Sequence, residues 1–260
     1  MSGSIYMAAY GALAYQHRME ILSNNIANVN TAGYKQDKTQ FQKYYASALE
    51  NDNFEASSNT DASQVAEYWF ELSSHTDYSS GPLKKTGNRF DLAIEGKGFF
   101  CVETPDGIQY TRRGDFGIDV NGNLITQEGW PVLGEGGEIF VESQADFTDK
   151  DGHELLVHGD GTVEVDGNNV GKLLIVEFAD PQQLSKAGNT YFSLGSGNAV
   201  ESEATDYRIS QGMIELSNVD AVRMMTELIE TLRGYESYQK VIRSIDEMNS
   251  LAIKEVGKTS

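Results

Sequence analysis

An apolar stripe recurs at both ends of this chain, and it constrains the fold more than any other feature. In the first thirty residues, apolar side chains follow each other at alternating steps of three and four, which keeps them on one side of a helix. Residues 217–260 carry a similar stripe on a predicted helix of about 40 residues, which would extend about 60 Å. A β-domain of this size cannot cover that length. Its apolar face is therefore expected to pack on the N-terminal helix and on further copies of the chain.

The two stripes predict which residues make these contacts. The N-terminal stripe lies on a helix predicted from Ile5 to about Asn30 and consists of Ile5, Ala8, Ala12, Tyr15, Met19, Leu22, Ile26 and Val29. The C-terminal stripe consists of Val222, Met225, Leu228, Leu232, Tyr235, Tyr238, Ile242, Ile245, Ala252 and Val256. Their shared period indicates that the two helices form a coiled coil.

Four amides crowd the end of the first helix although Asn is a weak helix former: Asn24, Asn25, Asn28 and Asn30. They can either bond to neighbouring helices and fix the register, or solvate a fraying helix end. Gly33 follows them and is placed to close the helix in the left-handed conformation.

The middle of the chain predicts β-structure. From Phe90 to about Leu216, short alternating runs are separated by turns such as Asp106-Gly107 and Asp160-Gly161, which supply the positive φ of tight hairpins. Residues 36–81 are poor in aliphatic side chains, which favours an extended arm that orders on assembly. Ser217 with Asp220 resembles a capping box, which predicts that the last helix begins there.

The fold class predicted is mixed α and β, with terminal helices forming a coiled coil around a central all-β domain of short antiparallel strands. The predicted parts are an N-terminal coiled-coil helix (1–35), an extended, conditionally ordered arm (36–81), an all-β body (82–216) and a C-terminal coiled-coil helix (217–260).

The charge is concentrated in the middle. The net charge is −19, yet residues 1–35 sum to +1 and residues 217–260 to −1, so residues 36–216 carry the whole −19. Such a field repels nucleic acid and anionic membranes. No stretch reaches the ~18 apolar residues of a membrane span, and the N-terminal segment lacks a cleaved-signal pattern. We expect no nucleic-acid binding and no membrane insertion, and any export by another route.

Signs of catalysis or metal binding are weak. Cys101, the single cysteine, lies in a Gly-Phe-Phe-Cys-Val run typical of a buried strand. Nucleophile-elbow, phosphate-loop and zinc spacings do not occur. The best metal candidate, 149–153 with His158 and Asp160, lacks a complete calcium loop and is typical of a solvated turn. We predict no catalytic residue, cofactor or metal. The alternative is a secreted acidic β-domain that binds or hydrolyses a ligand, with coiled-coil ends for oligomerisation.

Three separated motifs, in the same order, resemble those of bacterial flagellar axial proteins of the rod and hook. The first is Leu22-Ser-Asn-Asn-Ile-Ala-Asn-Val-Asn-Thr-Ala-Gly-Tyr-Lys35. The second comprises 87–100 (GNRFDLAIEGKGFF) and 110–116 (YTRRGDF). The third comprises 212–220 (GMIELSNVD), Arg233-Gly-Tyr-Glu236 and 242–248. The length and the run 131–137 (PVLGEGG) resemble proximal-rod members more than distal-rod members, whereas Gly234 departs from an Ala frequent in the family.

The resemblance implies a structural subunit of the flagellar basal-body rod, the drive shaft that carries torque across the periplasm. It implies export through the flagellar type III apparatus, and helical assembly with copies of itself and other rod proteins. In that assembly the terminal helices would form the inner tube and the β-body the outer layer. The expected subunit-contact residues are the two stripes up to Ala252, the four amides and Gly33.

Overall fold

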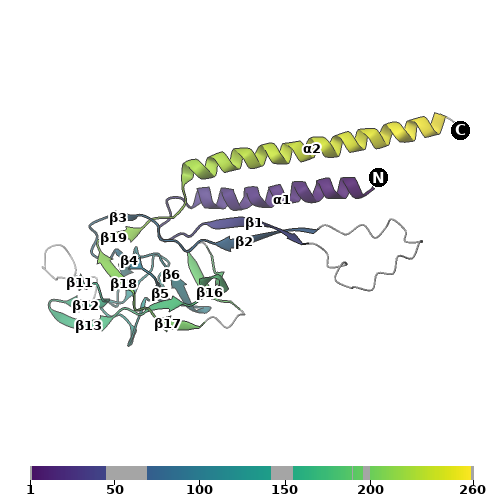
Figure 1. Cartoon of the computed structure of the whole chain (residues 1–260). Helices are drawn as coiled ribbons and strands as arrows, with labels where there is room; N and C mark the ends of the chain where they lie inside the picture. Colours follow the sequence, from purple (N-terminus) through teal and green to yellow (C-terminus); the bar gives the residue numbers. More distant parts are fainter. Residues whose placement is uncertain (1, 45–68, 142–154, 189, 196–199, 259–260) are drawn as a thin grey trace, which may run out of the picture. The chain divides into compact units, whose positions relative to one another are not determined.

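The computed structural model describes residues 2–44, 69–141, 155–188, 190–195 and 200–258 (Figure 1). The chain divides into two compact units. The helical unit contains Met1–Ile26, Asp37–His75 and Ala221–Ser260, and the β unit contains Ala27–Gln36 and Thr76–Asp220. Two terminal helices and a central antiparallel β-rich region confirm the mixed α and β class.

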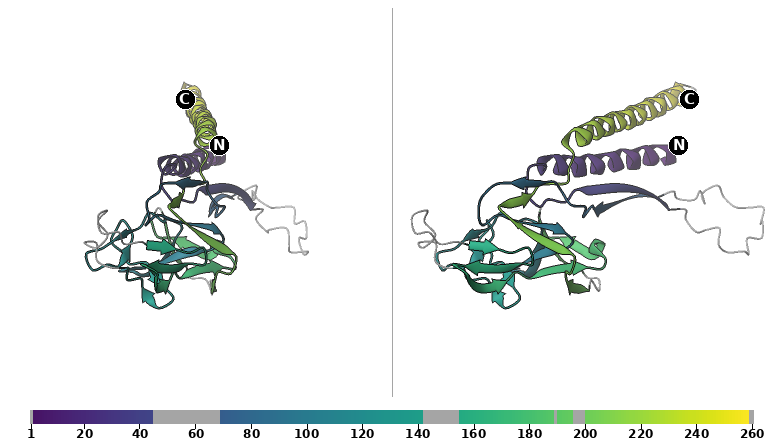
Figure 2. Two further views of the ribbon diagram at one scale, coloured as in Figure 1. Left: turned by 90° about the vertical axis from the view of Figure 1, so that its left-hand side faces the viewer. Right: turned by 60° about the vertical axis from the view of Figure 1, so that its left-hand side comes forward.

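Two helices dominate the helical unit: α1 (Ser2–Ala27) and α2 (Ala221–Lys258). They lie side by side and run in opposite directions (Figures 1 and 2). A Ser217 N-cap predicts a helix from residue 218, but α2 begins at Ala221, three residues later, so that prediction is wrong. The side chains of Ser217 and Asn218 bond instead to backbone groups of the β unit, which keeps this segment out of the helix.

Within the predicted arm, β1 (Asp37–Tyr44) and β2 (Trp69–Thr76) pair in a two-stranded sheet. The rest of that arm, 45–68, lies outside the described residues. One amide of α1 holds the start of β1: Asn25 Nδ2 donates to the Asp37 carbonyl at 2.8 Å, and the Asp37 N–H donates to Asn25 Oδ1 at 3.0 Å. The buried amide therefore satisfies the backbone where the chain leaves the helix.

The β unit is built around an antiparallel six-stranded sheet with the order β15-β16-β6-β5-β14-β17. Its central hairpin joins β5 (Phe99–Thr104) and β6 (Gly107–Thr111), and Gly107 has the positive φ of 108° that the turn motif predicts. The remaining strands of this sheet are β14 (Ile175–Phe178), β15 (Leu184–Lys186), β16 (Tyr191–Leu194) and β17 (Glu201–Glu203). A 3-10 turn, Pro181–Gln183, precedes β15.

Smaller sheets pack around it. β4 (Leu92–Gly96) pairs with β18 (Tyr207–Gln211), and β3 (Leu83–Lys85) pairs with β19 (Met213–Glu215). β11 (Leu155–Val157), β12 (Thr162–Val165) and β13 (Asn168–Lys172) form a three-stranded sheet. Two short pairs complete the unit: β7 (Gly117–Ile118) with β8 (Leu124–Ile125), and β9 (Leu133–Gly134) with β10 (Gly137–Glu138). Two apolar clusters form the core of this unit.

The residues considered as a nucleophile or as metal ligands pack or bond within the β unit. Cys101 is buried in β5, as predicted, and burial raises the pKa of its thiol to about 12. His158 pairs with Glu164, and Asp160 accepts bonds from the backbone and hydroxyl of Thr162. The run 149–153, which is the candidate metal site, lies outside the described residues. The described residues contain no cluster of side chains suited to a metal ion. No helix in the described part of the chain is long and apolar enough to cross a membrane.

Candidate assembly segments

Two tyrosines pack reciprocally onto two glycines where α1 meets α2. A Cβ added to Gly234 would lie 2.2 Å from Cε1 of Tyr15, and one added to Gly11 would lie 2.3 Å from Cε1 of Tyr238. The two tyrosine rings are themselves 5.5 Å apart between centroids. Each ring therefore occupies the space that a larger residue at the facing glycine would fill. The step from Gly11 to Tyr15 along α1 is matched by the step from Tyr238 back to Gly234 along α2. The two contacts therefore define one antiparallel register for the helix pair.

An ion pair lies further along the same two helices. Arg18 Nη2 is 3.7 Å from Glu227 Oε2, and Glu227 also accepts from Arg223 Nε at 3.0 Å. Partly exposed pairs of this kind contribute only about 0–1 kcal/mol. Orientation comes mainly from the glycine and tyrosine contacts.

The α1 stripe lies on a single face, as its spacing predicts. Of the stripe residues within α1, Ala8, Ala12 and Leu22 are buried, and Ile5, Tyr15, Met19 and Ile26 are half-buried. Val29 is also half-buried but lies beyond α1, which ends at Ala27 rather than near the predicted Asn30.

The α2 stripe is divided, contrary to the single face predicted. Leu228, Tyr235, Tyr238, Ile242 and Ile245 are half-buried, but Val222, Met225 and Leu232 are exposed, and the side chain of Ala252 lies outside the description. The buried face passes through Met224 and Thr231 instead. Thr231 can be buried because its hydroxyl donates to the Glu227 carbonyl at 2.7 Å. A pattern of apolar residue types cannot reveal a threonine satisfied in this way.

Two exposed apolar patches result. The α1 patch consists of Tyr6, Met7, Tyr10 and Leu13, all between 52% and 63% exposed. The α2 patch consists of Val222, Met225, Ile229 and Leu232, between 42% and 77% exposed. Sequence reasoning missed the α1 patch because it followed one stripe only. The missed signal is the absence of Asp, Glu, Lys and Arg from 2–17, which leaves no charged face for solvent.

The four amides at the end of α1 differ in burial, and Gly33 lies in a tight backbone turn beyond them. Asn25 and Asn28 are buried, whereas Asn24 and Asn30 are exposed. Asn28 Oδ1 accepts from the Thr31 hydroxyl at 3.2 Å. Gly33 has φ 68°, its N–H donates to the Glu215 carbonyl at 2.8 Å, and a Cβ there would lie 2.3 Å from the backbone of Arg113. Both the conformation and the space at this position require glycine.

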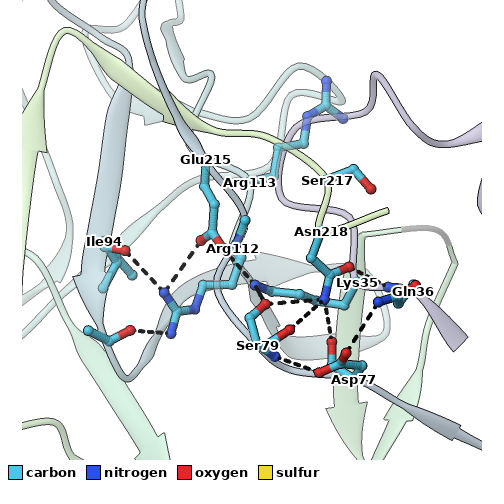
Figure 3. A network of polar contacts seen from close by, with 12 residues as sticks. Lys35, Gln36, Asp77, Ser79, Ile94, Arg112, Arg113, Glu215, Ser217 and Asn218 are labelled. Carbon is cyan, nitrogen blue, oxygen red and sulfur yellow. Dashed lines mark hydrogen bonds and ion pairs between the residues drawn. The ribbon is translucent and has the colours of Figure 1, made fainter. Parts of the chain in front are cut away.

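A buried ion cluster lies in the β unit, formed by Lys35, Glu215 and Arg112 (Figure 3). Lys35 Nζ donates to Glu215 Oε1 at 2.6 Å, and Arg112 Nη1 lies 3.4 Å from Glu215 Oε2. All three side chains are at most 5% exposed. Burial lowers the pKa of Lys35 and of Arg112, and the Glu215 carboxylate partly offsets both effects.

Backbone groups complete this Lys35–Glu215–Arg112 cluster. Lys35 Nζ also donates to the Ser79 carbonyl at 2.8 Å, and the Gly81 N–H donates to Glu215 Oε1 at 2.7 Å. Arg112 donates to the carbonyls of Ile94 and Gly96, at 3.1 and 2.7 Å. The buried charges are therefore paired, and their hydrogen bonds satisfy all three side chains except for Arg112 Nε, which has no hydrogen-bond partner among the described residues.

Asn218 extends the network beside the cluster (Figure 3). Its Oδ1 accepts from the Gln36 N–H at 2.9 Å, and its Nδ2 donates to the Asp77 carbonyl at 2.8 Å. The network thus joins the segment that follows α1 to the segment that precedes α2, inside one unit. Lys35 and Glu215 both fall within the sequence motifs, but the pairing of residues 180 positions apart gave no local signal.

Comparisons with known proteins match the same parts of the chain. Residues 5–35 match the family model "Flagella basal body rod protein", 93–165 match "Flagellar hook protein FlgE/F/G D1 domain", and 210–255 match "Flagellar basal body rod FlgEFG protein C-terminal".

Full-length relatives show the same similarity. The flagellar basal-body rod protein FlgF of Caulobacter vibrioides is 31% identical over 99% of both chains. The flagellar basal-body rod protein FlgG of Bacillus subtilis is 32% identical over 95% of this chain and 97% of its own. The flagellar hook-basal body complex protein FlhO of Bacillus subtilis is 31% identical over 99% of this chain and 100% of its own.

Proposed function

This chain belongs to the family of flagellar basal-body rod proteins, and we propose that its paired terminal helices are the segments through which it joins the rod. It is a structural subunit of the basal-body rod and acts in flagellar motility. The relatives carry the names of rod proteins rather than of enzymes, so the ligand-binding or hydrolytic alternative has no support from them. We propose that the chain itself performs no catalysis.

The α1 patch is the observation that carries the proposal. It exposes four large apolar side chains on a segment without a charged residue, in a chain whose net charge is −19. Soluble proteins seldom leave such a patch in water unless a partner covers it. The opposite face of α1 is already used against α2, as the contacts of Tyr15 and Gly11 require. A further protein surface is therefore the partner that this patch needs.

The remaining parts of the sequence prediction belong to the same proposal. The antiparallel register supports a coiled coil of α1 with α2. We propose the same four parts that the sequence predicts: the N-terminal helix (1–35), the arm (36–81), the β-body (82–216) and the C-terminal helix (217–260). In the rod, the helices would lie inside and the β-body outside.

Assembly with other rod and hook-basal-body proteins follows from the family. We propose that the flagellar type III apparatus exports the chain, and that contacts include copies of the same chain. We also propose the proximal part of the rod, because the chain length and the run 131–137 resemble proximal-rod members.

A single added charge tests whether the α1 patch is a subunit contact. Leu13→Asp places a carboxylate in the exposed patch, where the free monomer leaves it in water but an assembled contact would bury it. We expect normal expression and export, no rod beyond this layer and no swimming. Gln16→Asp is the matched control, since Gln16 is exposed on the same helix outside the patch. Normal swimming of Leu13→Asp would refute the assignment, as would an equal defect in the control.

A further inference from the structure

One strand of the β unit has an edge that no described residue covers. β3 (Leu83–Lys85) pairs only with β19 among the described strands, and all three of its residues are exposed. Figure 1 draws the two strands side by side. An uncovered edge offers its backbone N–H and C=O groups to any other strand that approaches. The β3 edge is therefore a place where two copies of the chain could pair.

The register identifies which backbone groups of β3 point outward. The Pro82 carbonyl and the Thr86 N–H each form a 2.9 Å bond with a residue that directly flanks β19. Successive residues of an antiparallel strand direct their backbone groups to opposite sides. The groups of Lys84 therefore face β19, and those of Leu83 and Lys85 face outward. No described residue bonds to the outward groups.

The side chains along this edge differ in charge from the rest of the β unit. No Asp or Glu occurs from 78 to 90, although residues 36–216 carry the whole net charge of −19. Lys84 and Lys85 are neighbours in the strand, so their side chains lie on opposite faces of it. Neither ammonium group forms an ion pair with a described residue. A strand that approached this edge would meet an unpaired lysine on either face.

We propose that Lys84 and Lys85 keep the β3 edge from pairing with a second copy of the chain. The inference goes beyond the proposed function, because it concerns a contact that the chain avoids. A second β3 strand at this edge would bring lysines close to lysines, and like charges on facing strands are destabilising. It would also bury ammonium groups for which no carboxylate is present. Lysines and short strands are recurrent means of protecting sheet edges.

The edge is also too short to serve as a docking strand. The next residues that would point outward are Gly81 and Gly87, and both N–H groups are already used. Gly81 donates to a carboxylate oxygen of Glu215 at 2.7 Å, and Gly87 donates to a backbone carbonyl at 3.1 Å. Lysines on opposite faces of the strand also cannot both meet one flat acidic surface. Protection therefore fits the β3 edge better than docking of an acidic partner.

Replacing the two lysines tests the proposal. In the full chain, Lys84→Val with Lys85→Val puts strand-forming residues at the edge. Two apolar cross-strand pairs in place of two like-charged ones should raise the self-association constant roughly tenfold, measured by sedimentation velocity. Lys84→Glu with Lys85→Glu keeps a charge on each face and should associate no more than the native chain. Lys97→Val is the matched control, because Lys97 is an exposed lysine between β4 and β5, outside any strand.

Hydrogen exchange of the backbone amides gives an independent measurement. In the dilute native chain the amides of Leu83 and Lys85 should exchange fast and that of Lys84 slowly, and all three should be protected in the associated double Val variant. Slow exchange at Leu83 and Lys85 in the native chain would mean that the edge is already covered, and would overturn the proposal. So would a double Val variant that associates no more than the native chain, or equal association of Lys97→Val. A double Glu variant that stays folded and monomeric but builds no rod would overturn it in favour of docking.

Discussion

Removing the carboxylate of Glu215 is the perturbation with the largest expected effect on the β unit. Glu215→Leu leaves Lys35 and Arg112 buried without their counter-ion and takes an acceptor from the Gly81 N–H. Breaking a buried ion pair in this way costs about 3–5 kcal/mol. Since a domain is stable by about 5–15 kcal/mol in all, Glu215→Leu should remove a large part of that stability.

Urea unfolding of the purified chain measures this effect, with the fluorescence of Trp130, which packs on the core of the β unit, as the probe. Glu138→Leu is the matched control, because Glu138 is exposed in β10, and a change within about 0.5 kcal/mol is expected there.

A triple variant separates charge from shape. Changing Lys35 and Arg112 to Met together with Glu215→Leu removes every charge of the cluster and should recover most of the lost stability, since apolar replacement of a buried ion pair is often neutral or stabilising. If Glu215→Leu costs less than about 1 kcal/mol, the range of an ordinary hydrogen bond, the account of the cluster is wrong.

Three further predictions concern single contacts. Gly234→Leu should abolish rod assembly without changing the unfolding of the β unit, because its side chain overlaps the Tyr15 ring, and Tyr15→Ala should restore swimming; absence of any defect would contradict the register. The hydrogen bond to Glu164 raises the pKa of His158, so the charged His158 stabilises the fold fully below its ordinary pKa of about 6.5, and this stabilisation is lost as pH rises through the raised pKa. Over that pH range the melting temperature of the native chain should therefore fall, and the melting temperature of His158→Gln should not show this fall. A maleimide should label Cys101 at neutral pH only after unfolding, and rapid labelling of the folded chain, followed by mass spectrometry, would show that its burial is wrong.

The sequence predicted those parts of the fold whose signal is local. The stripe of α1 lies on one face because every third or fourth residue faces the same side of a helix. The β5–β6 hairpin forms at Asp106-Gly107, where Gly107 adopts the left-handed conformation. Each of these features depends on a few neighbouring residues, which a single sequence contains in full.

Features that depend on distant partners were missed. The pairing of β18 with β4, where Ile209 lies opposite Ile94, was not predicted, because the two strands are more than 100 residues apart in the chain and nothing local specifies the partner. The ion cluster was missed because charged residues are almost always solvated, and only the fold brings Lys35 to Glu215. The α1 patch was missed for the opposite reason: its signal was local, but one stripe had already been assigned to that helix.

A density map of the basal body with resolved side chains would show directly whether the terminal helices make the subunit contacts. We expect α1 and α2 of each copy to pair as Tyr15 on Gly234 and Tyr238 on Gly11, with neighbouring subunits covering the remaining apolar side chains of both helices. A map in which subunits touch only through their β units, with Tyr10 and Ile229 facing solvent, would contradict it.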